Sequence, residues 1–432
     1  MELKKYKLAD IAKIEISGVD KKTIEGETPV RLCNFVDVYY NWAITKEKAK
    51  SFMAASAKQT EINKCSIGKG MVAITKDSET RDDIGVATYI ADDFENVVLG
   101  YHCALITPNP AVVDGKYLNA FMHTRYIQKY FENNASGSGQ RYTLSNDTIG
   151  NIPVLLPSVE EQHTIGKVLA DIDRKIELNK QINDNLEAMA KQLYDYWFVQ
   201  FDFPNEEGKP YKSSGGAMVW NEKLKRKIPN GWTVETVGTY ANCKSGYAIK
   251  SSDFKAKGIP VIKIGNIQED YTLNMNGCQY IENNTNKLFY VYQNDVVIAM
   301  TGATIGKFAI VPFSETGYFV NQRVGKFELG NNPIKKMPYL INSLKIDYFR
   351  NQIFQLASGC AQPNISAEQI NNISLLYPST KILSEYNMKC KWMYEQIANC
   401  RYQIDVLTKL RDKLLPLLMN GQATVNYHLS AY

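Results

Sequence analysis

The sequence lacks the features of a membrane-spanning or a secreted, disulfide-linked protein. None of its apolar runs reaches the roughly 18 residues of a membrane span. Its start, Met1–Lys5, has neither the apolar stretch nor the cleavage site of a signal peptide. Eight cysteines are present, but no two are separated by only two residues, as a zinc knuckle or a redox motif requires. We therefore expect a cytoplasmic chain whose cysteines are small buried thiols.

Recognisable catalytic motifs are also missing. The four histidines do not fall at metal-ligand spacing, and no zinc-deaminase pattern is present. The run Gly302–Lys307 approaches a phosphate-binding loop, but it is one residue short. Phe308 stands where a magnesium-binding Ser or Thr is needed. We interpret the run as a turn that feeds a strand. The sequence thus predicts no catalytic residue and no metal site, and a nuclease or methyltransferase with an unrecognised site remains the enzymatic alternative.

Charge is moderate overall but unevenly distributed. The 432 residues carry a formal net charge of +5, with 44% hydrophobic and 22% charged residues, which is ordinary for a globular protein. Residues 46–76 contain seven lysines and two glutamates, and residues 244–263 contain five lysines and one aspartate. Two separate basic segments favour two contact surfaces for a polyanion, whereas two solvated lysine faces are the alternative.

The chain contains an internal repeat. Ala135–Gln140 (ASGSGQ) returns 222 residues later as Ala357–Gln362 (ASGCAQ), and Leu144–Ile152 matches Ile365–Ile373. A period near half the chain is too long for a solenoid and indicates a duplicated module. Each copy has the same order of parts: short β-like runs, a helical stretch, a glycine-bearing polar loop, a short strand and a long helix. The sequence therefore predicts an α+β protein with two similar globular domains.

The two long helices carry the clearest periodicity. Apolar residues recur in steps of four and three from Ile165 to Trp197 and again from Leu383 to Leu414, with Asn179 and Asn183 on the first seam. Such a repeat predicts a coiled coil, in which seam asparagines specify the register at some cost in stability.

Both helices have a partner within the chain, so we expect an intramolecular antiparallel pair. A homodimeric scaffold built through the heptads is the alternative. Ser158 and Glu161 form a capping box that begins the first helix, and Asn420-Gly421 ends the second. From Glu160 to Trp197 the first helix would span about 57 Å at about 1.5 Å per residue.

Several segments resemble those of a known family. Leu156–Ala170 (LPSVEEQHTIGKVLA), Tyr196–Phe203 (YWFVQFDF) and Lys409–Gly421 (KLRDKLLPLLMNG) are similar to the conserved helices of the specificity subunit of type I restriction-modification enzymes. Ala135–Gln140 and Gly302–Lys307 are also family-like. The likeness covers the whole chain in the family's order. It departs from the family after Pro378, where the Glu-Gln pair of the first helix has no counterpart.

The resemblance implies a division of the chain. We expect a first recognition domain at 1–157 and a first spacer helix at 158–201. A basic linker at 202–231 then leads to a second recognition domain at 232–378. The second spacer helix at 379–421 is followed by a tail at 422–432. The two antiparallel helices would join the two domains.

The resemblance also implies a non-catalytic subunit that binds no cofactor itself. Its partners would be double-stranded DNA with a bipartite site, two methyltransferase subunits and, in the full assembly, two restriction subunits. S-adenosylmethionine would bind to the methyltransferase subunit, which methylates adenine, and ATP and Mg to the restriction subunit. Each recognition domain would read one half of the site, and the helices would set the gap.

Candidate DNA-binding residues follow from charge and residue type. Phosphate contacts position a protein on DNA, whereas Arg, Asn, Gln and Ser side chains on exposed loops read bases. For phosphates we expect Lys46, Lys48, Lys50, Lys69, Lys250, Lys255, Lys257 and Lys263. For bases we expect Ser136, Ser138, Gln140, Arg141 and Tyr142, with the counterparts Ser358, Gln362 and Asn364. The alternative for these loops is a shared structural role, which their similarity in the two copies favours. Asn321, Gln322 and Arg323 are weaker candidates.

Overall fold

The computed structural model describes residues 2–137, 140–283, 286–357 and 363–425. The chain divides into two compact units. Unit 1 comprises residues 1–177 and 406–432, and unit 2 comprises residues 178–405. Each unit holds one copy of the repeat together with part of each long helix.

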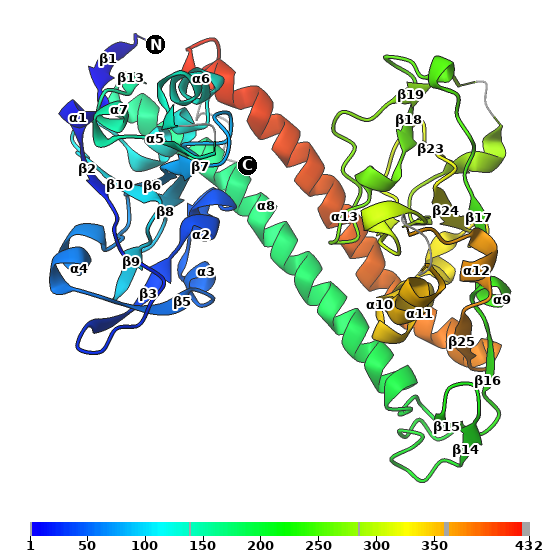
Figure 1. Ribbon diagram of the computed structural model, residues 1–432. Helices are drawn as coiled ribbons and strands as arrows, with labels where there is room; N and C mark the ends of the chain where they lie inside the picture. The colour runs from blue at the N-terminus through cyan, green and yellow to red at the C-terminus, as the bar shows by residue number, and fades with distance from the viewer. Residues whose placement is uncertain (1, 138–139, 284–285, 358–362, 426–432) are drawn as a thin grey trace, which may run out of the picture. The chain divides into compact units, whose positions relative to one another are not determined.

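Unit 1 is built around a five-stranded, mostly antiparallel sheet (Figure 1). Its strands, in spatial order, are β2 (Ala12–Ile16), β10 (Cys103–Pro108), β6 (Val72–Thr75), β8 (Ala87–Ile90) and β4 (Ala43–Ile44). A second sheet has the order β5 (Met53–Ala57), β3 (Thr28–Cys33) and β9 (Val97–Leu99). Two smaller ladders are β1 (Lys4–Lys7) with β13 (Pro153–Leu156), and β11 (Ser136–Gly137), β12 (Tyr142–Thr143) and β7 (Asp77–Ser78). The helices are α1 (Leu8–Ile11), α2 (Phe35–Tyr39), α3 (Lys46–Ala49), α4 (Gln59–Cys65), α5 (Gly115–Met122), α6 (Arg125–Asn134) and α7 (Asn146–Gly150).

Helix α6 packs closely on a turn between β7 and β8. Gly85 in this turn has φ +80°, and a Cβ there would lie 2.2 Å from the ring of Phe131 on α6. Only glycine combines the left-handed backbone with this close approach. Its repeat counterpart Gly306 has φ +79° and lies under Ile353 of the equivalent helix. The Ile-Gly pair therefore recurs in both copies because the packing of sheet and helix demands it.

Unit 2 repeats the plan with shorter strands. One sheet has the order β17 (Cys243–Ser245), β24 (Val324–Phe327), β21 (Val296–Ala299) and β22 (Phe308–Ile310). The other has the order β19 (Tyr280–Ile281), β18 (Ile259–Ile262), β23 (Tyr318–Val320) and β20 (Tyr290–Val291). β16 (Thr233–Thr236) pairs with β25 (Ser374–Tyr377). The helices are α9 (Val237–Tyr240), α10 (Met337–Lys345), α11 (Asp347–Ala357) and α12 (Ala367–Asn371), and α10 and α11 lie beside the first half of α13 (Thr380–Met419) (Figure 1).

The segment expected to be a linker contains a hairpin of β14 (Met218–Asn221) and β15 (Arg226–Pro229). Phe203, Ile228 and Trp232 are buried in the core of unit 2 beside Phe198. The turn formers and charges of this segment belong to an ordered hairpin whose apolar residues pack inward.

The two long helices pair in antiparallel fashion, as the sequence predicts. These are α8 (Val159–Tyr194), which continues into a π-helical turn at Asp195–Val199, and α13. In unit 1, Arg411 of α13 forms an ion pair of 3.5 Å with Asp173 of α8. In unit 2, Asn179 Nδ2 donates to Gln403 Oε1 at 3.1 Å, and the Tyr386 hydroxyl donates to the Ala190 carbonyl at 3.4 Å. As the residue numbers rise along α8, the numbers of their contact residues on α13 fall, so the two helices run antiparallel.

Local details of the helices also match the sequence predictions. The Glu161 amide donates to Ser158 Oγ at 3.3 Å and the Ser158 amide donates to the Glu161 carboxylate at 3.1 Å, which is the predicted capping box. α13 ends at Met419, two residues before Gly421 with φ +73°. Seam residues Asn179 and Asn183 are buried.

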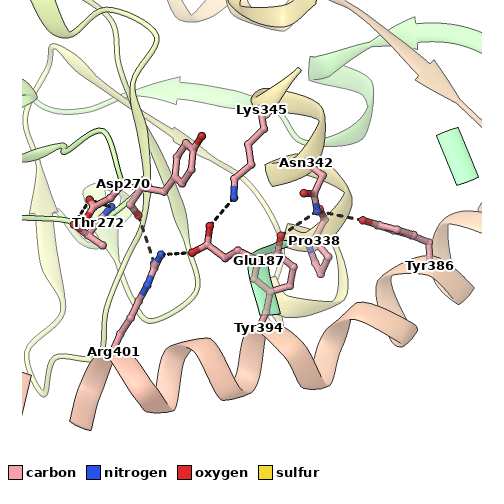
Figure 2. Close-up of polar contacts among 10 residues, drawn as sticks. Glu187, Asp270, Thr272, Pro338, Asn342, Lys345, Tyr386, Tyr394 and Arg401 are labelled. Carbon is pink, nitrogen blue, oxygen red and sulfur yellow. Dashed lines mark hydrogen bonds and ion pairs between the residues drawn. The ribbon is translucent and has the colours of Figure 1, made fainter. Parts of the chain in front are cut away.

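A largely buried charge cluster ties α8 to α10 and α13 in unit 2 (Figure 2). Glu187 lies between two cations, with Lys345 Nζ at 2.8 Å and Arg401 Nη2 at 2.9 Å. Desolvation lowers the pKa of Lys345, although the Glu187 carboxylate opposes this shift. Arg401 also donates to the backbone carbonyl of Tyr271, so the cluster connects the helices to the loop before β19.

Candidate nucleic-acid interface

The first basic segment lies around α3 of unit 1. Lys46, Lys50 and Lys69 are exposed. The Lys46 amide donates to the carboxylate of Asp92 at 2.9 Å, and the Lys69 amide donates to that of the adjacent Asp93 at 3.0 Å. The backbones at Lys46 and Lys69 are therefore anchored to two consecutive aspartates of the same loop.

Neighbouring carboxylates reduce the positive charge of this segment. Lys50, which directly follows α3, pairs with Glu47 of that helix. The Lys48 side chain is only 16% exposed, and its Nζ lies 3.2 Å from Glu177 of α8. Lys48 therefore holds α3 against the long helix, while Lys46 and Lys69 remain the better placed candidates for phosphate contact.

The second basic segment lies between β17 and β18 in unit 2. Lys250, Lys255 and Lys257 are exposed, and Lys255 forms a loose ion pair of 3.8 Å with Glu282. Lys263 is half-buried: its Nζ lies 4.2 Å from the centre of the Phe254 ring and bonds to Gln279. Three of the four predicted lysines are thus placed to approach an anionic ligand.

The loop of unit 1 that is predicted to read bases, residues 136–142, forms a hairpin that is anchored to β7. Ser136 of β11 pairs with Thr143 of β12, and Tyr142 pairs with Ser78. Gln140 and Arg141 are exposed at its tip, whereas Ser138 lies outside the described residues. The guanidinium of Arg81 lies 5.0 Å from the centre of the Tyr142 ring. The hairpin both packs on the sheet and presents polar side chains, so the two interpretations of this loop are compatible.

Arg141 belongs to a charged cluster that sequence reasoning missed. Its Nη2 lies 3.0 Å from the imidazole nitrogens of His102, and His102 Nδ1 lies 2.6 Å from Asp77 Oδ2. Lys76 Nζ reaches the same Asp77 oxygen at 3.0 Å. His102 has φ +73°, a left-handed conformation that non-glycine residues rarely adopt and that is often found at functional sites.

The surroundings of Asp77 favour its ionised form. Burial favours its neutral form, but hydrogen bonds from Thr143, His102 and Lys76 outweigh burial and hold the pKa of the carboxyl below its usual value. The cluster combines one carboxylate with several donors at the surface of unit 1. No local motif could have revealed it, because β7, the turn before β10 and the β11–β12 hairpin each contribute part.

The counterpart region in unit 2 is only partly described. Ser358 and Gln362 lie outside the described residues, while Asn364 is exposed and pairs with Thr301 in a β-bridge. Asn364 lines a hollow together with Gln322 and Arg323, so the weaker candidates of the sequence lie next to one of the stronger ones.

The run that resembles a phosphate-binding loop is a turn, as predicted. Gly302–Thr304 form one turn of 3-10 helix, and the chain then enters β22 at Phe308. Lys307 Nζ pairs with Glu269 at 3.0 Å. Among the described residues no group of three metal-ligating side chains occurs. Within the same ranges, none of the helices is both long and apolar enough to cross a membrane.

The geometry defines a class: a duplicated α+β module in which each copy carries its own polar surface and contributes to a shared helix pair. Comparison with known proteins identifies the family. Residues 1–188 and 229–386 match the type I restriction modification DNA specificity domain, one match over each copy of the repeat. The chain therefore belongs to the family of type I restriction-modification specificity subunits, which are DNA-recognition subunits and not catalytic ones.

Individual relatives agree with this assignment. The chain is 26% identical over 326 residues to the type I restriction enzyme MjaIX specificity subunit of Methanocaldococcus jannaschii, covering 74% of this chain and 71% of that one. It is 24% identical over 398 residues to the HindI specificity subunit of Haemophilus influenzae, covering 80% and 85%. The crystal structure of the type I S subunit from M. genitalium has the same fold, with a TM-score of 0.60, 16% identity and coverage of 97% and 96%.

Proposed function

We propose that each unit reads one half of a bipartite site in double-stranded DNA. The observation that carries this proposal is the duplication itself: two copies of one module each bear an exposed basic segment, and both match the specificity domain. Lysines of these segments would contact phosphates and position the units, while polar side chains of the reading loops would contact bases. Ser138, Ser358 and Gln362 remain part of this proposal.

The helix pair would set the unread gap between the half-sites. α8 alone has 36 residues and spans about 54 Å at about 1.5 Å per residue. Half-sites on one face of B-DNA recur about every 34 Å. A helix of this length is therefore sufficient to bridge one helical turn of DNA or more.

The helices would also dock two methyltransferase subunits, which carry S-adenosylmethionine and methylate adenine. On α8, Leu178, Ile182 and Met189 are about half exposed and lie on one face at steps of four and seven. On α13, Met388 and Trp392 form a similar exposed pair. Apolar residues at helical spacing on a surface are typical of a protein-binding face. In the complete assembly, restriction subunits would add ATP- and Mg-dependent cleavage.

The test of the two-reader model is the methylation pattern of genomic DNA. The chain would be co-expressed with a methyltransferase subunit of its system, and methylated adenines would be mapped by sequencing. We expect a split motif. Methylation of a continuous motif, or an unchanged pattern when this chain is omitted, would contradict the model and favour the enzymatic or scaffold alternative.

The role of the lysines can be tested separately by salt dependence. Replacing Lys250, Lys255 and Lys257 by glutamine should weaken binding of the complex to all duplexes alike. The slope of log affinity against log salt concentration should become shallower by about one for each phosphate that the variant no longer neutralises. Lys335→Gln, an exposed lysine elsewhere in unit 2, is the matched control and should leave the slope unchanged.

The docking face has its own test. Ile182→Glu with Met189→Glu should prevent co-purification of the methyltransferase subunit with this chain. Lys180→Glu adds a comparable charge at another exposed position of α8 and should leave the complex intact. Co-purification that survives the double substitution would exclude this face of α8 as the docking site.

A further inference from the structure

Three segments of unit 1 meet through backbone hydrogen bonds at one surface. The Lys76 amide, just after β6, donates to the carbonyl of His102 at 2.8 Å. The Leu144 amide, just after β12, donates to the carbonyl of Lys76 at 2.8 Å. These two bonds hold Lys76, His102 and Leu144 side by side, although they come from distant parts of the chain.

Unit 2 contains the same framework. The Met300 amide, just after β21, donates to the carbonyl of Arg323 at 3.0 Å. The Ile365 amide donates to the carbonyl of Met300 at 2.9 Å. Met300 is therefore the structural equivalent of Lys76, Arg323 that of His102, and Ile365 that of Leu144.

The backbone bonds of this framework are kept, but the side chains differ at five pairs of equivalent positions on and beside it. The equivalent pairs, unit 1 first, are Lys76 and Met300, Asp77 and Thr301, Tyr101 and Gln322, His102 and Arg323, and Thr143 and Asn364. Residues that a duplicated fold needs for its own stability tend to match, as Gly85 and Gly306 do. Two units that recognise different DNA half-sites instead require the same backbone frame with different polar side chains.

In unit 2 this framework surrounds a hollow. Met300, Thr301, Gln322, Arg323 and Asn364 line it, and Gln322, Arg323 and Asn364 are exposed. The Thr301 hydroxyl is buried, and it has no hydrogen-bond partner among the residues that the structure describes. A buried hydroxyl without a partner is costly, so its presence in the wall of the hollow points to a polar ligand.

We propose that this hollow reads base edges of one half-site, with Arg323, Gln322 and Asn364 as specificity-determining residues. The equivalent surface of Tyr101, His102 and Arg141 reads the other half-site. The chemistry fits duplex DNA: an arginine fork matches the O6 and N7 acceptors of guanine, and Gln or Asn amides match the N6 and N7 groups of adenine. This proposal rests on the split-site function proposed above and assigns its readers.

The test uses the full chain in complex with its methyltransferase subunit. Genomic adenine methylation would be mapped for the unsubstituted complex and for Arg323→Ala, Gln322→Ala and His102→Ala. We expect Arg323→Ala to lower discrimination at one base pair of one half-site about ten- to a hundredfold and to leave the other half unchanged. His102→Ala should alter only the other half. Lys257→Ala, a proposed phosphate contact, should change no base preference.

Binding to defined duplexes covers the case in which Arg323→Ala abolishes methylation. The probes would be a duplex with the mapped motif and a duplex with one half-site scrambled. Equal losses of affinity for both duplexes would make Arg323 a phosphate contact and overturn the proposal. A loss of affinity for the duplex with the mapped motif, with no loss for the scrambled duplex, would support the proposal. Arg323→Lys keeps the charge but not the planar fork of donors, so it should show the same loss of selectivity.

Two failures are distinguishable. A split motif that stays the same in all three variants would overturn the assignment of these readers and leave the two-reader function standing. Absence of any split motif with the unsubstituted complex would overturn both.

Discussion

The N-termini of the equivalent helices α5 in unit 1 and α10 in unit 2 are attached to the long helices in different ways. In unit 1, Asp114 caps its own helix α5 by accepting from the Tyr117 amide at 2.9 Å. The Asp114 amide in turn donates to Gln162 of α8 at 2.9 Å. In unit 2, the equivalent amide of Tyr339 donates directly to Asn387 of α13 at 2.9 Å. The cap is therefore local in unit 1, whereas a residue of the long helix provides it in unit 2.

The difference shows how a duplicated module can keep its topology while its polar anchors change. Gln162 belongs to the Glu-Gln pair that the second helix lacks, and Asn387 provides the corresponding tether one turn further along. Asn387 is 3% exposed, and its amide donates to the Tyr240 hydroxyl, which is also buried, at 3.1 Å. Together with the Glu187 cluster, this makes unit 2 the more dependent on buried polar contacts with the helix pair. The following substitutions test that contrast.

The largest effect is expected from Glu187→Ala. The substitution leaves Lys345 and Arg401, both less than one-fifth exposed, as neighbouring buried cations without their shared carboxylate. Breaking a buried ion pair by removing one partner costs about 3 to 5 kcal/mol. Urea unfolding should show this loss in the free energy of unfolding.

The matched control is Lys391→Ala, which removes an exposed ion pair with Glu395 on α13. Exposed pairs of this kind contribute about 0.3 to 0.5 kcal/mol. A loss from Glu187→Ala no larger than that of the control would mean that the cluster is already solvated and does not anchor unit 2.

Asn387→Ala should come next, at about 2 to 3 kcal/mol. It leaves the buried Tyr339 amide without a partner, which costs about 1 to 3 kcal/mol. It also removes the hydrogen bond that the Tyr240 hydroxyl accepts, although this hydroxyl still donates to the Lys336 carbonyl at 2.8 Å.

Asp114→Ala in unit 1 removes a partly exposed helix cap and should cost about 1 kcal/mol. It also removes the 2.9 Å contact of the carboxylate with the exposed His163 of α8, which should add little. Equal losses in the two variants, measured by urea unfolding, would contradict the contrast between local and long-helix capping.

Unit 1 is expected to be the acid-sensitive unit. Burial, and then the nearby Arg411 charge, lower the pKa of His123 to about 4. Its ring stacks on Trp42 at 4.2 Å, and its Nε2 lies 3.0 Å from the Ala87 carbonyl. The unfolded chain therefore binds a proton between pH 6.5 and 4 that the folded unit does not, so stability falls as pH falls through this window.

Between pH 7 and pH 5 the loss from His123 should be about 2 kcal/mol. Residues 178–405 contain no histidine, so unit 2 has no such contribution. Urea unfolding at the two pH values would be compared with the variant His123→Gln, whose stability should be less dependent on pH. An unchanged pH dependence in this variant would show that another group is responsible.

The sequence alone predicts much of this architecture, because the signals are local or periodic. The repeat, the capping box at Ser158 and the seam through Asn179 follow from spacing, and the structure confirms them. At the end of α8, Tyr194, Trp197 and Phe198 are buried in the core of unit 2, while Tyr196 stays partly exposed.

The site is less predictable because it depends on contacts between distant segments. In the sequence Lys48 is one of a run of positive charges, but Glu177 neutralises it from more than a hundred residues away. Asp77, His102 and Arg141 carry no motif individually, and only the meeting of three chain segments makes them a cluster. Residue type therefore identified candidate loops, whereas the partners of each side chain required the fold.

The smallest effect concerns the seam of the helix pair. Asn183 is buried and its side-chain oxygen has no hydrogen-bond partner within the described ranges, whereas the nearby Asn179 donates to Gln403. Asn183→Leu should therefore raise the free energy of unfolding by about 1 kcal/mol, because it removes an unsatisfied group and adds apolar contact. Asn179→Leu leaves the Gln403 carbonyl oxygen without its donor and should bring less gain. If urea unfolding shows that Asn183→Leu destabilises the chain, Asn183 has a partner in solution, and the seam owes its register to both asparagines.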